Sequence, residues 1–169
     1  MKHLLATAFS TAVLVSPAAA DIGETASASF VDRAGEVVGR GVLTQTNAGV
    51  LIELEVATLP AERWIAFHIH EGGVCDAEND HEAAGDHFSP SGAAHGFLAQ
   101  EGPHEGDMPN QYVPADGILR AQVLKAGVTL TDGEADIRGR TLLLHAEPDD
   151  HESQPAGGAG DRIACAVIE

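Results

Sequence analysis

The sequence predicts an all-β domain, an antiparallel sandwich or barrel of eight short strands. Three observations predict this class. Strand-like segments recur between turn signals, and no segment carries the apolar stripe of an amphipathic helix. Aromatic residues make up only 4% of the chain, so the core must be packed mainly from Val, Leu, Ile and Ala. A length of 169 residues suits one domain with one core.

Each expected strand is a short apolar or β-branched segment bounded by turn residues. The clearest alternation is that of Ile52, Leu54 and Val56 with two glutamates, which is the period-two pattern of a strand with one buried face. In chain order, the expected strands are residues 26–31, 37–46, 50–58, 64–70, 118–124, 128–131, 140–145 and 162–168.

Two stretches interrupt this rhythm. Residues 71–110 show no periodicity over about 40 residues, and residues 147–160 form a shorter loop rich in Gly, Asp and Pro. A connection as long as the first needs something other than a hydrophobic face to order it. It contains Cys75, three histidines and Asp107, so a disulfide and a metal ion could replace the missing core.

The first twenty residues have the pattern of a secretory signal peptide. Lys2 precedes an apolar run from Leu4 to Val15, and three alanines ending at Ala20 follow. The apolar run is too short to span a bilayer, which takes about 20 residues. We therefore expect cleavage after Ala20, a periplasmic or otherwise secreted location, and a mature domain of residues 21–169.

The expected mature chain is strongly acidic, with 8 basic and 26 acidic residues and a formal net charge of −18. This charge disfavours nucleic acid and anionic membrane surfaces as partners. It also poses a difficulty for any anionic substrate.

The chain has two cysteines, Cys75 and Cys165. In an exported protein they predict a single disulfide, and the lack of a C-x-x-C pair argues against a redox motif or a cysteine-rich zinc module. Closing a loop of about 90 residues is worth roughly 4 to 5 kcal/mol in the chain-entropy model.

Two histidines alternate within one expected strand. His68 and His70 leave its same face, and His145 ends another expected strand. Three imidazoles without thiolates suit copper or zinc, and copper binds more tightly along the divalent series. The alternative is that His68 and His70 are ordinary surface histidines. The presence of His145 at the end of another expected strand favours metal binding over this alternative.

A second group lies in the long loop and consists of His87, His95, His104 and Asp107. Three imidazoles and a carboxylate make the closed four-ligand set of a structural zinc site. The alternative is a polar loop that is rich in histidine by chance. Only three of the nine histidines fall outside the two groups. His3 belongs to the expected signal peptide, and His81 and His151 are expected to be solvated loop residues.

Several motifs together resemble the copper-zinc superoxide dismutases, in particular their secreted bacterial branch. They are FHIHE at 67–71, AGDHFSP at 84–90, the histidine at 95, HEGDMPN at 104–110, GRTLLLH at 139–145 and DRIACAVI at 161–168. The match covers nearly all of the expected mature chain. The resemblance implies an eight-stranded Greek-key β-barrel with a long metal-binding loop and a shorter active-site loop.

The resemblance also implies the ligands of both metals. The copper ligands would be His68, His70, His87 and His145, and the zinc ligands would be His87, His95, His104 and Asp107. His87 would be shared, which requires both of its ring nitrogens to be free of protons.

Further roles follow from the same resemblance. Asp149 matches the carboxylate that links a copper histidine to a zinc histidine. Arg162 matches the arginine beside the copper that holds the substrate anion, and Cys75 and Cys165 match the family disulfide. The sequence departs from the family pattern at several positions. Asp86 adds an acidic residue before the shared histidine, Asp161 adds one before Arg162, and Ile65 and Ala66 precede the copper motif.

The implied activity is the dismutation of superoxide to dioxygen and hydrogen peroxide, an antioxidant function in which copper cycles between oxidation states. His87 and Arg162 would be the catalytic residues, and zinc would order the loop. One alternative is a non-catalytic exported copper- and zinc-binding protein on the same barrel. A structural β-domain with incidental histidines is another, and it predicts no tight metal binding. The oligomeric state stays open: Trp64 and Tyr112 are candidates for a homodimer contact, and the alternative is that they are packed aromatics.

Overall fold

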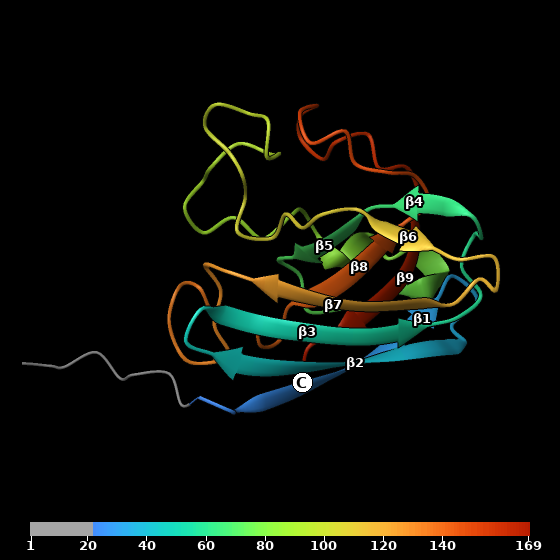
Figure 1. The fold of residues 1–169 in the computed structure, drawn as a ribbon, viewed down its shortest axis with the longest axis horizontal. Coiled ribbons are helices and arrows are strands. Elements are labelled where there is room, and N and C mark those ends of the chain that lie inside the picture. The colour runs from blue at the N-terminus through green and yellow to red at the C-terminus, as the bar shows by residue number, and fades with distance from the viewer. Residues whose placement is uncertain (1–21) are drawn as a thin grey trace, which may run out of the picture.

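The computed structural model describes residues 22–169, so the expected signal peptide lies outside the described residues. Seven strands form one sheet in the order β5-β8-β9-β1-β2-β3-β7, and two form a separate ribbon, β4-β6 (Figure 1). In chain order the elements are β1 (Thr25–Asp32), β2 (Val37–Thr46), β3 (Gly49–Val56), β4 (Arg63–Ile65), β5 (Phe67–His70), the 3-10 turns η1 (Ala77–Asn79) and η2 (Glu82–Ala84), β6 (Gln111–Val113), β7 (Leu119–Lys125), β8 (Thr141–His145) and β9 (Arg162–Val167). The expected all-β class is confirmed.

The sheet has Greek-key connections. Strands β1, β2 and β3 follow one another as antiparallel hairpins, but β7 returns to pair with β3, and β9 returns to pair with β1. The ribbon lies between the two sheet edges, because β4 runs into β5 and β6 contacts β7. Figure 1 shows the sheet curled, with the two long loops projecting from one side of it.

The core lies inside this curled sheet. The alternation expected from the sequence is present in β3, where Val50, Ile52, Leu54 and Val56 are all buried. Strands β5 and β8 differ because every one of their residues is buried. Their apolar side chains on one face join the core, and the long loop covers the other face.

The disulfide expected between Cys75 and Cys165 is present. It packs with Ala84 and Leu143 in a small apolar cluster outside the main core. The bridge thus fastens the start of the long loop to β9 and holds that loop against the outer face of β8.

Of the expected strands, one divides into two and one is absent, and one observed strand was not expected. Residues 64–70 divide at Ala66 into β4 and β5, which belong to different sheets. Residues 128–131 form no strand: Thr129 makes only an isolated parallel bridge to Asp136, and the side chain of buried Gln45 accepts hydrogen bonds from Leu130 N (2.8 Å) and Thr129 Oγ1 (3.0 Å). Strand β6 was missed because it is only three residues long.

Within residues 22–169, no helix has the length and apolar character needed to cross a membrane.

Candidate metal centre

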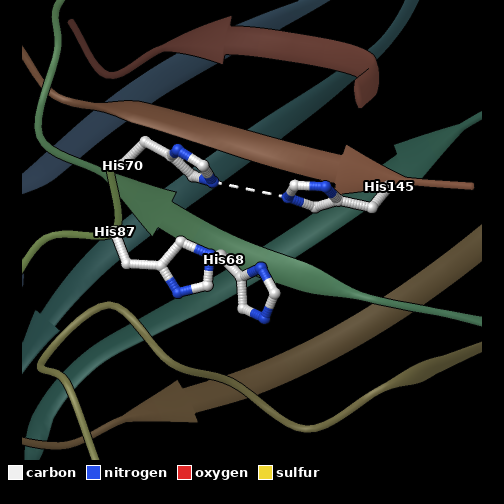
Figure 2. Close-up of side chains that lie close together, drawn as sticks. All are labelled: His68, His70, His87 and His145. Carbon is white, nitrogen blue, oxygen red and sulfur yellow. Dashed lines mark hydrogen bonds between the residues drawn. The ribbon is translucent and has the colours of Figure 1, made fainter. Parts of the chain in front are cut away.

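Four histidines meet above the outer face of β5 and β8. His68 and His70 leave the face of β5 opposite the core residues Phe67 and Ile69, and His145 stands at the end of β8. His87 reaches them from the long loop, whose backbone forms a single β-bridge to His70. The four rings offer nitrogens that all lie within 4.8 Å of one another (Figure 2).

Two of these rings are oriented by backbone carbonyls. His70 Nδ1 lies 2.9 Å from Gly85 O, and His145 Nδ1 lies 3.4 Å from Gly160 O, so each Nδ1 carries the proton and donates. The two Nε2 atoms therefore present lone pairs, and they lie only 3.3 Å apart. A cation between two such lone pairs would satisfy both.

The other two rings complete the set. His68 Nε2 lies 2.9 Å from Asp149 Oδ2 and donates to it, which leaves Nδ1 without a proton. Both His68 Nδ1 and His87 Nε2 are buried with no hydrogen-bond partner among the described residues. Buried polar atoms are seldom left unpaired. The four-imidazole set therefore fits a copper ion.

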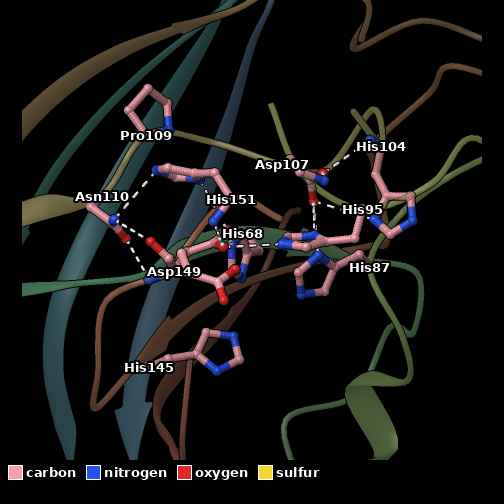
Figure 3. Close-up of polar contacts among 12 residues, drawn as sticks. His68, His87, His95, His104, Asp107, Pro109, Asn110, His145, Asp149 and His151 are labelled. Carbon is pink, nitrogen blue, oxygen red and sulfur yellow. Dashed lines mark hydrogen bonds and ion pairs between the residues drawn. The ribbon is translucent and has the colours of Figure 1, made fainter. Parts of the chain in front are cut away.

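The second predicted group also comes together, around one oxygen of Asp107 (Figure 3). Asp107 Oδ1 lies 2.8, 3.1 and 3.2 Å from the Nδ1 atoms of His87, His95 and His104. The other oxygen accepts backbone N–H groups of Gly96 and His104, which fixes the carboxylate. Three imidazoles and one carboxylate are a complete ligand set for zinc.

Both ring nitrogens of His95 face carboxylate oxygens. Its Nε2 lies 3.0 Å from Asp149 Oδ1 and its Nδ1 lies 3.1 Å from Asp107 Oδ1. A neutral imidazole has one N–H and can donate to only one carboxylate. With a cation bound at Nδ1, a neutral His95 that donates from Nε2 to Asp149 would satisfy both contacts.

Asp149 links the two groups, since its two oxygens accept from His68 and His95. Asn110 holds the Asp149 backbone in turn: Asn110 Nδ2 donates to Asp149 O, and Asp149 N donates to Asn110 Oδ1, both at 2.8 Å. Hydrogen bonds of this kind fix the tautomer and the orientation of metal-binding imidazoles.

Burial sets the charge state of the site. Desolvation lowers the pKa of His68 to about 4 and holds the pKa of His70 and His145 well below the usual range, so all three are neutral at pH 7. Burial acts to raise the pKa of Asp107 and Asp149, but hydrogen bonds from imidazole and backbone N–H groups outweigh it and hold both well below the usual range. Neutral imidazoles and ionised carboxylates are the states that bind metals.

A cavity of about 750 Å³ leads to the imidazoles of His70, His87 and His145. Arg162 is the only lysine or arginine among the described residues that line it. Its Nη1 donates to His81 O and its Nη2 to Gly85 O, both at 2.8 Å. A cation thus lines the same cavity as three members of the four-histidine group, although Glu71 and Asp86 also line it.

Two histidines that were expected to be solvated are not. His81 was expected to be solvated, but it is fully buried beside Arg162, while His151 is half-buried and lies 3.3 Å from Asn110 Nδ2. Asn110 and Gly157, which packs against Asp149, were not predicted. Asn110 ends the HEGDMPN motif and could have been noticed there, whereas Gly157 stands in a glycine-rich loop that gives no such signal.

Comparison with known proteins agrees with this geometry. The family model described as copper/zinc superoxide dismutase matches residues 37–168. A relative from Aquifex aeolicus, "Superoxide dismutase [Cu-Zn] 2", is 48% identical over 147 residues, 85% of each chain. "Superoxide dismutase [Cu-Zn]" from Caulobacter vibrioides is 38% identical over 85% of this chain and 86% of its own.

Solved structures share the fold. A SOD-like protein from Bacillus subtilis gives a TM-score of 0.81 at 30% identity and covers 85% of this chain and 97% of its own. The Cu/Zn superoxide dismutase from Brucella abortus gives a TM-score of 0.72 at 26% identity over 86% of this chain and 100% of its own. The chain belongs to the copper/zinc superoxide dismutase family.

Proposed function

We propose that this protein dismutates superoxide with a copper and a zinc ion that share His87. Superoxide dismutation is the activity of the family, whose members use copper and zinc. The proposed copper ligands are His68, His70, His87 and His145, and the proposed zinc ligands are His87, His95, His104 and Asp107. The observation that carries the proposal is that His87 belongs to both groups: Nδ1 faces Asp107, and Nε2 is buried without a partner among the described residues.

Dismutation oxidises one superoxide to dioxygen and reduces a second, with two protons, to hydrogen peroxide. Copper, when bound, supplies the electron acceptor and donor, and zinc supplies charge without redox chemistry. The neutral, buried imidazoles of His68, His70 and His145 hold their free nitrogens toward one point. His87, which lines the cavity, is the proposed proton carrier.

Arg162 is the proposed anion-holding residue. Its guanidinium is held by the carbonyls of His81 and Gly85 and lines the cavity that leads to the imidazoles. The chain as a whole is strongly acidic, and charges farther than about 10 Å are largely screened at 0.1 M salt. Local positive charge must therefore attract superoxide.

The disulfide and the bacterial relatives indicate an exported protein. We further propose that residues 1–20 are a signal peptide cleaved after Ala20, that residues 21–169 are the mature domain in the periplasm, and that this domain binds neither nucleic acid nor membranes. A homodimer is proposed through Trp64 on β4 and Tyr112 on β6, which are 55% and 46% exposed and pack edge to face at 5.4 Å.

Metal analysis combined with an activity assay tests the function. Protein comprising residues 21–169 should hold one copper and one zinc per chain, consume superoxide, lose activity when copper is removed, and regain it when copper is restored. Protein that binds both metals tightly but does not accelerate superoxide loss would instead be a non-catalytic metal carrier. Failure to bind either metal would leave only a structural β-domain.

A further inference from the structure

A second arginine, Arg33, contacts the residue before Arg162 and does not line the cavity. Arg33 follows β1 directly, and its Nε donates to Asp80 Oδ1 at 2.7 Å while its Nη2 contacts the same oxygen. Its Nη1 donates to Asp161 Oδ2 at 2.9 Å. One guanidinium therefore joins three segments: the end of β1, the long loop between η1 and η2, and the residue before Arg162 at the start of β9.

The segment that Arg33 holds is also the segment that holds Arg162. Asp80 and His81 are consecutive, and both have left-handed backbones, with φ of 52° and 60°. Non-glycine residues seldom adopt this conformation, and two in succession persist only where their surroundings impose it. Asp80 is bound through its side chain by Arg33, and His81 O accepts from Arg162 Nη1 at 2.8 Å, while the His81 imidazole is fully buried.

The same contacts affect the charge around Arg162. Asp161 is adjacent to Arg162 in sequence, and its side chain is 74% exposed, while that of Asp80 is 60% exposed. Without Arg33, two unpaired carboxylates would stand beside the cation that attracts the substrate anion. Arg33 offsets one of these charges and directs both carboxylates toward itself.

We propose that Arg33 is a positioning residue for anion capture: it fixes the Asp80–His81 backbone that holds Arg162, and it offsets the acidic side chain of Asp161. This inference rests on the proposed function. Isolated exposed ion pairs usually contribute little. This one differs in that a single arginine forks onto two carboxylates from separate segments, next to a strained backbone that carries a functional contact.

Arg120 provides a matched control. It lies on β7, is 53% exposed, pairs with Glu55 and Asp116, and does not line the cavity. Arg120→Ala therefore removes one positive charge and two ion pairs, as Arg33→Ala does. Because both variants lose one positive charge, a difference between them shows that the position of that charge matters.

Both variants would be prepared as residues 21–169 with copper and zinc bound. The rate with superoxide would be measured over a range of ionic strengths, and azide affinity for the cupric protein would be measured by absorption titration, which does not depend on turnover. At low salt we expect Arg33→Ala to lower both quantities roughly 3- to 10-fold, with the difference shrinking as salt increases, and Arg120→Ala to change them less than about 2-fold. Metal content and unfolding temperature should match in the two variants. Arg33→Gln, which keeps a hydrogen-bond donor without the charge, replaces the alanine variant if that one is unstable.

Adding Asp161→Asn to Arg33→Ala removes one of the uncompensated charges, so it should recover part of the lost rate and of the lost azide affinity. Equal rates and azide affinities for the Arg33 and Arg120 variants would overturn the inference. The proposed function is judged separately: if the unaltered protein is active and Arg162→Ala impairs it while Arg33→Ala matches the control, only the role of Arg33 fails. Lack of activity in the unaltered protein overturns the proposed function itself.

Discussion

Gly157 packs against the Asp149 carboxylate, which links the two groups of proposed ligands. A Cβ added at this position would lie 1.8 Å from Asp149 Oδ1 and 2.7 Å from His95 Nε2, whereas ordinary van der Waals contact begins at about 3.4 Å. The adjacent Gly158 has nearly the same backbone, with φ of 65° against 66°, but an added Cβ there meets nothing within 4 Å. Gly157→Ala and Gly158→Ala thus share their backbone strain and differ only in the clash.

The expected magnitudes follow from these distances. Alanine in the left-handed region costs about 1–2 kcal/mol, and both variants should lose this much stability. In Gly157→Ala the Asp149 carboxylate must also move by more than 1 Å, which breaks its hydrogen bonds to His68 Nε2 and His95 Nε2. Loss of such an outer partner typically lowers metal affinity by about 10- to 100-fold.

The assay is a competition titration of zinc against a chelator, together with urea unfolding of the metal-free proteins. Gly158→Ala should bind zinc as the unaltered protein does, and Gly157→Ala should bind it about 10- to 100-fold more weakly. Equal zinc affinities in the two variants would refute the reasoning, because they would mean that the position of Asp149 does not affect the ligands.

Three further predictions concern substrate capture, acid stability and the disulfide. Arg162→Ala should leave metal content unchanged and lower the rate with superoxide severalfold or more; an unchanged rate contradicts the role given to this residue. Acid should destabilise the metal-free protein. The pKa of His68 is about 4 in the folded protein against a usual 6.5, so the unfolded chain takes up the proton first, and stability falls as the pH drops from about 6.5 toward 4. This histidine alone should lower the free energy of unfolding by roughly 2 kcal/mol between pH 7 and pH 5, measured as a shift in the urea unfolding midpoint. Equal stability at pH 7 and pH 5 would contradict this prediction. Replacing Cys75 and Cys165 together by serine should lower the free energy of unfolding by roughly 4 to 5 kcal/mol, since the bridge spans 90 residues, and a loss below about 1 kcal/mol would show that it contributes little to stability.

Local patterns predicted most of the fold. Alternation and turn residues located β1, β2, β3, β7, β8 and β9 to within a residue or two. The pattern failed at 128–131, where Leu130 N donates to a buried glutamine side chain, and at Ala66, where the chain passes from the ribbon into the main sheet. Such contacts join residues far apart in sequence, so no local sequence pattern predicts them.

The site divides in the same way. Residue types and spacing predicted one group of three histidines and a second group of three histidines and Asp107, and the structure brings each group together. The place of His87 in the first group and the link through Asp149 came only from the family resemblance, because neither leaves a periodic pattern in the sequence. His81 could not be foreseen as buried, since its burial follows from how the disulfide-anchored loop folds against β8 and β9.

The central claim is that His87 joins two different metal ions through its two ring nitrogens. Electron paramagnetic resonance of the cupric, zinc-loaded protein, with His87 labelled by nitrogen-15, tests it most directly. We expect coupling between copper and a labelled His87 nitrogen, and we expect His87→Ala to lose that coupling together with most of the turnover. A cupric centre with no coupling to His87, or full turnover in His87→Ala, would contradict it.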